Sequence, residues 1–131
     1  MEKTSQRVTR RHFDAVLFDL DGVLTDTARV HASCWKKMFD SFLLNNAKRK
    51  NVPFKAFDID TDYIQYVDGK PRYEGVESFL RSRGITLPYG LPESTGDENS
   101  VCGLGNLKTG LVQEILASEG VSVYDGSVAF V

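Results

Sequence analysis

The sequence predicts a mostly α-helical chain that also contains one strand of the kind found in parallel α/β sheets. The apolar run Ala15–Phe18 lacks the alternation of a solvent-edged strand, which favours burial on both faces. Apolar residues that recur at steps of three and four indicate several helices after it. No second strand follows to pair with the first. The chain is therefore either a helical bundle with an unpaired strand or the first part of a longer α/β protein.

The composition is that of one globular domain. The chain has 131 residues, of which 41% are apolar and 26% charged, and its net charge is -2. This charge gives no overall attraction to polyanions, so we expect no nucleic-acid partner. The N-terminus lacks an apolar stretch and no segment is long enough to cross a bilayer, so we expect no membrane partner and a cytoplasmic location. Cys34 and Cys102 lack the spacing of a zinc site and are expected to be reduced thiols.

Acidic residues follow the predicted strand directly. Residues 1–12 are polar and basic, which predicts a flexible tail before the strand. Asp19, Asp21 and Gly22 then stand between the strand Ala15–Phe18 and the first helix. This order places both carboxyl groups at the carboxyl end of a strand, where open α/β sheets bind ligands. The sequence therefore predicts a site at this turn.

The first helix is predicted from Thr27, with Asp26 or Thr27 as its cap. Its apolar stripe consists of Cys34, Trp35, Met38, Phe39, Phe42 and Leu43. We expect the aromatic members of this stripe to belong to the core and not to stack on a ligand. The segment Asn45–Lys55 is basic and contains Pro53, so it is predicted to be a solvated connection.

Two further helices are predicted in the middle of the chain. Tyr63–Val67 is a short helical pattern after the cap-like residues Asp60 and Thr61. A second pattern covers Tyr73–Arg83, and Gly84 is placed as its C-terminal cap.

A long irregular segment precedes the last predicted helix. Ile85–Gly105 is rich in Pro, Gly, Ser and acidic residues and lacks periodicity. Asn106 is suited to cap a helix over Leu107–Glu119, which Gly120 ends. The glycines and the lysine of residues 103–110 superficially resemble a phosphate-binding loop. Their order differs from that motif and no strand precedes them, so we discount this interpretation.

The residues around Asp19 and Asp21 indicate the function of the two carboxyl groups. Two aspartates one residue apart, taken alone, are more often turn and capping residues. The complete run Phe18–Asp26, in which Asp-x-Asp-Gly-Val-Leu-x-Asp follows an apolar strand, closely resembles the first motif of the haloacid dehalogenase superfamily. From Phe13 onward the chain is most similar to beta-phosphoglucomutases and related sugar-phosphate enzymes within it.

The resemblance implies a fold and a division of the chain. The parent fold is a Rossmann-like α/β core with an inserted helical cap. Residues 13–28 would form the first core strand and the nucleophile loop, residues 29–120 the helical cap, and residues 121–131 the return to the core. The later family motifs, a Ser or Thr, a Lys and an acidic pair, are absent. We therefore expect that the chain is truncated just before them.

The resemblance also implies roles for the aspartates. Asp19 would form the phosphoaspartate, and Asp21 would act as general acid and base. Mg²⁺ would be held by the Asp19 carboxylate, the Asp21 backbone carbonyl and an acidic residue later in the chain. Phosphoryl transfer needs such a nucleophile, a proton carrier and cations, and an oxygen-rich acidic site suits Mg²⁺.

Three further residues match substrate-binding positions of the family. His31 lies where the family has a histidine just inside the first cap helix. Gly69 and Arg72 match the Lys-Gly-x-Ser-Arg loop that gates the active site, and the planar guanidinium of Arg72 suits a phosphate. Asp68 and Pro71 depart from this loop, because the family has lysine and serine there. With this departure, the resemblance does not by itself decide between a mutase and a phosphatase.

These residues predict a magnesium-dependent phosphotransferase that acts on a sugar phosphate through an aspartyl phosphate. The predicted reaction is that of a beta-phosphoglucomutase, and a sugar-phosphate phosphatase is the alternative. A different class, a non-catalytic helical binding module, also remains open. Because the later cationic and acidic groups are missing, we expect little activity from these 131 residues alone. We expect the chain to be a monomer.

Overall fold

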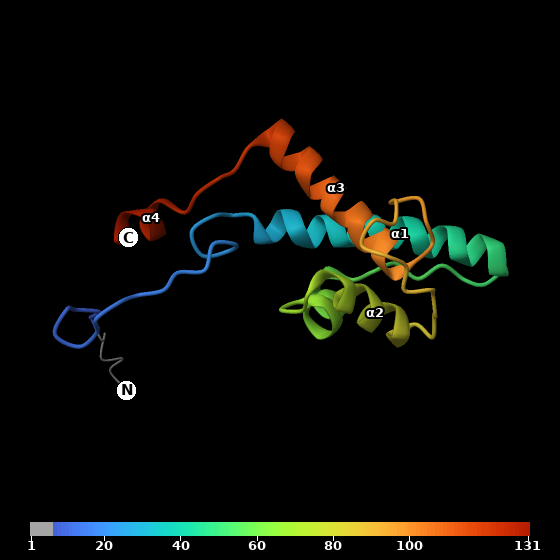
Figure 1. Ribbon diagram of the computed structural model, residues 1–131, viewed down its shortest axis with the longest axis horizontal. Helices are drawn as coiled ribbons and strands as arrows, with labels where there is room; N and C mark the ends of the chain where they lie inside the picture. Colours follow the sequence, from blue (N-terminus) through green and yellow to red (C-terminus); the bar gives the residue numbers. More distant parts are fainter. Residues whose placement is uncertain (1–6) are drawn as a thin grey trace.

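The computed structural model describes residues 7–131 and shows an elongated arrangement of helices (Figure 1). Residues 1–6 of the predicted tail lie outside the described residues. The helices in chain order are α1 (Ala28–Lys50), the π-helix η1 (Ile59–Val67), α2 (Arg72–Ser82), α3 (Val101–Glu119) and α4 (Asp125–Phe130). No helix in this part of the chain is long and apolar enough to cross a membrane.

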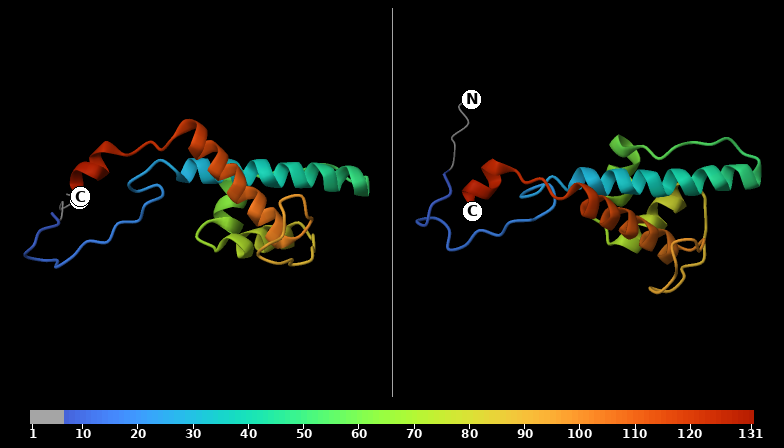
Figure 2. Two further views of the ribbon diagram at one scale, coloured as in Figure 1. Left: turned by 45° about the horizontal axis from the view of Figure 1, so that its top comes forward. Right: turned by 90° about the horizontal axis from the view of Figure 1, so that it is seen from above.

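Four of the helices form a bundle around an aromatic core. α1 packs against α3 and η1, and α2 packs against η1 and α3. Figure 2 shows α3 crossing α1, with α2 beneath them. Phe39, Phe57 and Phe79 are fully buried, and their ring centroids lie 4.3–5.0 Å apart. Trp35 and Phe42 are also buried, which confirms that the aromatic stripe of the first helix belongs to the core.

The predicted strand Ala15–Phe18 is not formed. This segment is extended and unpaired, the side chain of Leu17 is 97% exposed, and the described residues contain no sheet. A strand needs a neighbour for its backbone groups, and residues 7–131 offer none at this position. The prediction of a buried strand is therefore wrong for the chain as it stands.

The chain returns from α3 to the loop that precedes α1. Val123 forms an isolated antiparallel bridge with Thr25. The Asp26 backbone N–H donates to the Ser122 carbonyl at 2.9 Å, and the Tyr124 N–H donates to the Leu24 carbonyl at 3.0 Å. These bonds join the predicted nucleophile loop to the segment that follows the bundle.

α1 is longer than predicted, because the first part of the expected connection Asn45–Lys55 is helical. Ala, Lys and Arg favour helices, and the basic residues of the last turn lie at the negative end of the helix dipole. Asn46 and Ala47 are buried. The helix ends at Lys50 and is capped by Asn51, which has a left-handed backbone with φ of 51°.

The two middle helices occur close to their predicted places. Asp58 caps η1, since its side chain accepts from the N–H groups of Asp60 and Thr61. The predicted cap therefore lies two residues too late. α2 ends before Gly84, whose φ of 67° matches its predicted role in termination.

α3 begins six residues before the predicted start at Leu107. Ser100 caps it by accepting from the Gly103 N–H at 3.0 Å. Gly103 and Gly105, which fall in the segment predicted to be irregular, are required by close packing. A Cβ at Gly103 would lie 2.3 Å from the Glu98 carbonyl oxygen, and one at Gly105 would lie 2.8 Å from the Tyr73 ring. The glycines allow contact between elements and do not end the helix.

Candidate active site

An open cavity of about 340 Å³ brings all of the predicted site residues together. Its wall comes from the loop before α1, from α1, from η1, from the turn between η1 and α2, from the start of α2, and from α3. The residues that line it include Asp19, Asp21, His31, Trp35, Tyr63, Asp68, Gly69, Lys70, Arg72 and Lys108. Residues 89 positions apart in the sequence thus share one small volume, which is suited to a small ligand.

The loop that carries the two aspartates is a tight turn closed by its own backbone. Gly22 has φ of 76° and donates its N–H to the Thr25 carbonyl at 2.8 Å. The Leu20 carbonyl accepts from the N–H of Thr25 at 3.0 Å and from its hydroxyl at 3.1 Å. The Asp19 carboxylate accepts from the Leu20 N–H at 2.9 Å and is otherwise exposed. Asp19 is therefore accessible to a ligand.

Two buried threonines position Asp21. The hydroxyls of Thr25 and Thr27 lie 2.8 Å apart, and the Thr27 hydroxyl donates to the Asp21 carboxylate. Thr27 stands at the start of α1, but its side chain does not cap the helix as predicted. Its hydroxyl instead donates a hydrogen bond to the carboxylate of Asp21.

His31 connects Asp21 with a buried lysine. The His31 Nε2 atom lies 3.8 Å from an Asp21 carboxylate oxygen, and its Nδ1 atom lies 2.8 Å from the Lys108 Nζ. Burial lowers the pKa of His31, the positive charge of Lys108 lowers it further, and Asp21 acts in the opposite direction. His31 is therefore favoured as a neutral ring that accepts a hydrogen bond from the Lys108 ammonium.

Lys108 is the main site residue that the sequence analysis missed. Only 8% of it is exposed, and its Nζ lies 5.1 Å from the centre of the Trp35 ring. Burial lowers its pKa, because the charged form loses its water. The residue lies in the segment 103–110 that was discounted as a phosphate loop. Lys108 follows Leu107 on the predicted helix, and nothing in the sequence around it indicates that its side chain is buried beside His31.

Arg72 lines the cavity, but its guanidinium is largely held by the protein. It donates to the Thr109 hydroxyl at 2.6 Å and to the Tyr73 hydroxyl at 2.9 Å. Its Nε is shielded from solvent and has no partner among the described residues. Each terminal nitrogen keeps a second N–H, so the side chain retains donors for a ligand.

The turn between η1 and α2 contributes an acidic residue, Asp68, and a basic residue, Lys70, to the cavity wall. Gly69 has φ of 72°, a left-handed conformation that favours glycine. Lys70 donates to the Tyr66 carbonyl at 3.0 Å and to the Ser78 hydroxyl at 3.3 Å. Burial raises the pKa of Tyr63, and the neighbouring Asp68 raises it further.

The π-helical turn helps to place Tyr63 in this wall. The Tyr63 N–H donates to the Asp58 carbonyl at 3.1 Å, and the Asp68 N–H donates to the Tyr63 carbonyl at 2.8 Å. Both bonds span five residues, which defines the wider turn of a π-helix. Such turns are frequent at functional sites.

The donors at the loop fit Mg²⁺ in kind. The Asp19 carboxylate and the Asp21 backbone carbonyl are oxygen ligands, which Mg²⁺ prefers, and it commonly keeps several waters. No cluster of three or more His, Cys, Asp or Glu suited to a metal occurs within residues 7–131. These residues therefore supply only part of a coordination shell.

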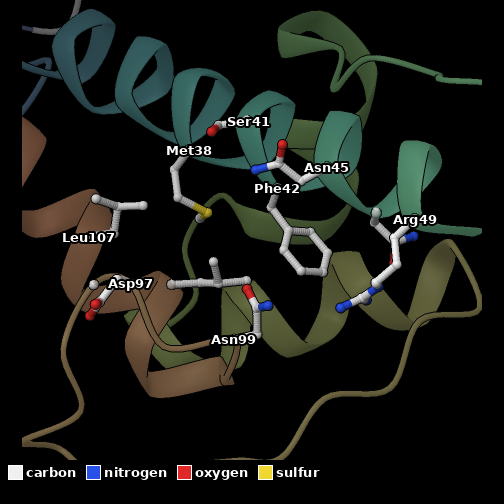
Figure 3. A pocket seen from close by; sticks show the side chains of 11 residues that line it. Met38, Ser41, Phe42, Asn45, Arg49, Asp97, Asn99 and Leu107 are labelled. Atoms are coloured by element: carbon white, nitrogen blue, oxygen red, sulfur yellow. The ribbon is translucent and has the colours of Figure 1, made fainter.

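A second cavity of about 370 Å³ lies further along α1 (Figure 3). Met38, Phe42 and Leu107 form part of its apolar wall, while Asn45, Arg49, Asp97 and Asn99 are among its polar residues. The guanidinium of Arg49 donates to the Asn46 side chain at 3.2 Å. No predicted site residue reaches this cavity.

Comparison with known proteins gives one family match and several relatives. The family described as haloacid dehalogenase-like hydrolase matches residues 13–131. A beta-phosphoglucomutase of Mycobacterium bovis is 50% identical over 113 residues, which cover 86% of this chain and 43% of that protein. A beta-phosphoglucomutase of Bacillus subtilis is 37% identical over 75 residues, which cover 57% of this chain and 27% of that protein.

Another relative is much longer. An uncharacterized glycosyl hydrolase of Mycobacterium tuberculosis is 37% identical over 119 residues, which cover 88% of this chain and 9% of that protein. The chain thus spans less than half the length of each of these relatives.

Proposed function

Because this chain belongs to the haloacid dehalogenase-like hydrolase family, we propose that it carries the nucleophile and part of the substrate pocket of a sugar-phosphate phosphotransferase. The family match and the beta-phosphoglucomutase relatives confirm the predicted resemblance and the enzyme class. One observation carries the proposal for this chain: Asp19, Asp21, His31 and Lys108 line the same open cavity. In the same proposal, residues 29–120 form the helical cap over this cavity.

In the proposed reaction, an Asp19 carboxylate oxygen attacks phosphorus in line with the bond to the sugar oxygen. That bond breaks, and the protonated Asp21 carboxyl group gives its proton to the departing oxygen. In the second half, Asp21 takes a proton from the accepting hydroxyl while the phosphoryl group leaves Asp19. The hydrogen bond from Thr27 supports this role, because it orients Asp21.

The cationic groups of the cavity support phosphate binding. Lys108 and Arg72 both line the cavity, and each terminal nitrogen of Arg72 has a second N–H besides the one that donates to Thr109 or Tyr73. Both are suited to balance the negative charge on the phosphoryl oxygens. The hydrogen bond to His31 fixes the position of the Lys108 ammonium.

Mg²⁺ would be held by the Asp19 carboxylate and the Asp21 backbone carbonyl. When bound, it would neutralise charge on the transferring phosphoryl group. Since two donors make an incomplete shell, we also propose that these 131 residues alone turn over substrate slowly.

The direct test is capture of the phosphoryl group. The chain is incubated with Mg²⁺ and ³²P-labelled acetyl phosphate, and acid-stable but base-labile label is located by peptide mapping. We expect label on Asp19 in the wild type and none in Asp19→Asn. Label that persists in Asp19→Asn, or its absence from the wild type at saturating acetyl phosphate, would contradict the proposal.

Product analysis then separates the two reactions left open by Asp68 and Pro71. Incubation with β-glucose 1-phosphate yields glucose 6-phosphate from a mutase and free phosphate from a phosphatase. Arg72→Lys keeps the charge but loses the planar fork. If Arg72 binds the phosphate, this variant raises KM more than it lowers kcat.

A further inference from the structure

Lys108 differs in its surroundings from the other lysines that the structure describes. It is buried within the α1–α3 contact, yet it lines a cavity that is open to solvent. Lys36 is held by the Asp40 carboxylate at 2.9 Å and by the Phe57 carbonyl at 2.7 Å. Lys48 and Lys50 are exposed on the last turn of α1. Lys108 therefore combines a dry environment with access to small molecules.

Burial shifts the equilibrium of Lys108 from the ammonium toward the neutral amine, which is the form that reacts with a carbonyl. His31 and Cys34 face it from α1, Asp21 from the preceding loop, and Arg72 from the start of α2. Burial has the largest effect and lowers the pKa of Lys108. Cys34 and Asp21 act in the opposite direction, and the positive charge of Arg72 lowers the pKa further. A lowered pKa raises the neutral fraction of a lysine near pH 7. Desolvated lysines of this kind are the ones that form Schiff bases.

We propose that Lys108 forms a reversible imine with phosphorylated aldehydes, such as the open-chain form of a sugar phosphate. The preference for an aldehyde that carries a phosphate rests on the proposed function, whereas the reactivity of the amine does not. The cavity of about 340 Å³ is large enough for such a molecule. Arg72 and Lys70 line the same cavity and supply positive charge for the phosphate.

The step balances without an additional reagent. The lone pair of the Lys108 Nζ adds to the carbonyl carbon, and the carbonyl electrons move to oxygen. The carbinolamine then loses water as the C=N bond forms. His31 Nδ1 lies 2.8 Å from the Nζ and is placed to move the proton from nitrogen to the departing hydroxyl. Hydrolysis by the reverse path releases the aldehyde.

Pyridoxal 5′-phosphate is the probe for this reaction. The wild-type chain is incubated with a limiting amount, reduced with sodium borohydride and digested, and each lysine is quantified by mass spectrometry. We expect more label on Lys108 than on Lys48 or Lys50. Pyridoxal, which lacks the phosphate, should label Lys108 less, and inorganic phosphate should compete with the phosphorylated probe. The Lys108→Arg variant, checked by circular dichroism, keeps the charge and should lose only this label.

The outcomes separate this inference from the proposed function. Imine trapping needs neither Mg²⁺ nor the nucleophile, so Asp19→Asn should still carry more label on Lys108 than on Lys48 or Lys50. Labelling of Lys108 that is no higher than that of Lys48 and Lys50 overturns the inference, whatever the phosphoryl-transfer experiments give. Equal labelling by pyridoxal and pyridoxal 5′-phosphate overturns the selectivity for phosphorylated aldehydes.

Discussion

At the scale of single residues, the charge of Lys108 affects the protonation of His31. Both pKa values are lowered mainly by burial, and each side chain is close to a second positive charge. Lys108→Met removes the positive charge beside His31, so the pKa of His31 should rise, although burial keeps it below an exposed histidine. Lys108→Arg retains the charge and should leave the pKa low. Titration of the His31 ring by NMR in the two variants measures the difference, and equal pKa values would exclude the charge effect.

The same lowered pKa makes stability depend on pH. A histidine whose pKa is lower in the folded chain binds fewer protons there than in the unfolded chain, so stability falls as the pH decreases below the unfolded value of 6.5. His31→Gln should reduce this loss. Urea unfolding above and below pH 6.5 measures it. If the free energy of unfolding changes with pH in His31→Gln as it does in the wild type, the pH dependence belongs to other groups.

Most of the candidate site was predictable at this scale, and its missing member has a physical reason. Asp19 and Asp21 stand in a local motif whose order is visible in the sequence, and His31 follows one helical turn after Thr27. Lys108 comes into the site only through the crossing of α1 and α3, 77 positions away from His31. Such long-range packing leaves no trace in the periodicity around Lys108.

At the scale of elements, replacing Gly105 or Gly110 of α3 by alanine should change the stability in opposite directions. A Cβ at Gly105 would lie 2.8 Å from the Tyr73 ring, whereas a Cβ at Gly110 would meet nothing within 4 Å. Gly105→Ala should lower the free energy of unfolding by about 1–3 kcal/mol through overpacking. Gly110→Ala should raise it by about 0.5–1 kcal/mol, because alanine favours the helix. Urea unfolding of this matched pair tests the packing, and a stabilised Gly105→Ala would contradict it.

The helix boundaries show which local rules hold. Gly84 and Gly120 end helices as predicted, because both adopt positive φ where the chain turns away. Gly103 and Gly105 also look like helix breakers in the sequence, but contacts with Glu98 and Tyr73 require small residues inside α3. The predicted strand fails for a related reason, since Ala15–Phe18 has the residues of a buried strand and no neighbour among the described residues. Propensity alone does not provide the partner that an element packs against.

At the scale of the whole molecule, stability is concentrated in the bundle. The packing between helices involves α1, η1, α2 and α3, and within residues 7–131 α4 packs against none of them. Outside the bundle, Leu17, Phe130 and Val131 are mostly exposed, so these segments bury little apolar surface. Hydrophobic burial is the main stabilising term, and segments with little of it open most readily.

Limited proteolysis should therefore leave a fragment that begins near Ala28 and ends near Glu119. Cleavage should occur first in residues 7–20 and 125–131, because their backbones are exposed and weakly held. The hydrogen bonds that join Leu24–Asp26 to Ser122–Tyr124 should delay cleavage at the base of the bundle.

The Tyr124→Phe variant tests this junction. It removes the hydrogen bond from the Tyr124 hydroxyl to Asp26, which is 3.0 Å long, and should speed cleavage there without altering the resistant fragment. Mass spectrometry of a digestion time course measures both effects. A resistant fragment that includes Ala15–Phe18 would instead show that the N-terminal segment packs on the bundle, and the two-part distribution of stability would then be wrong.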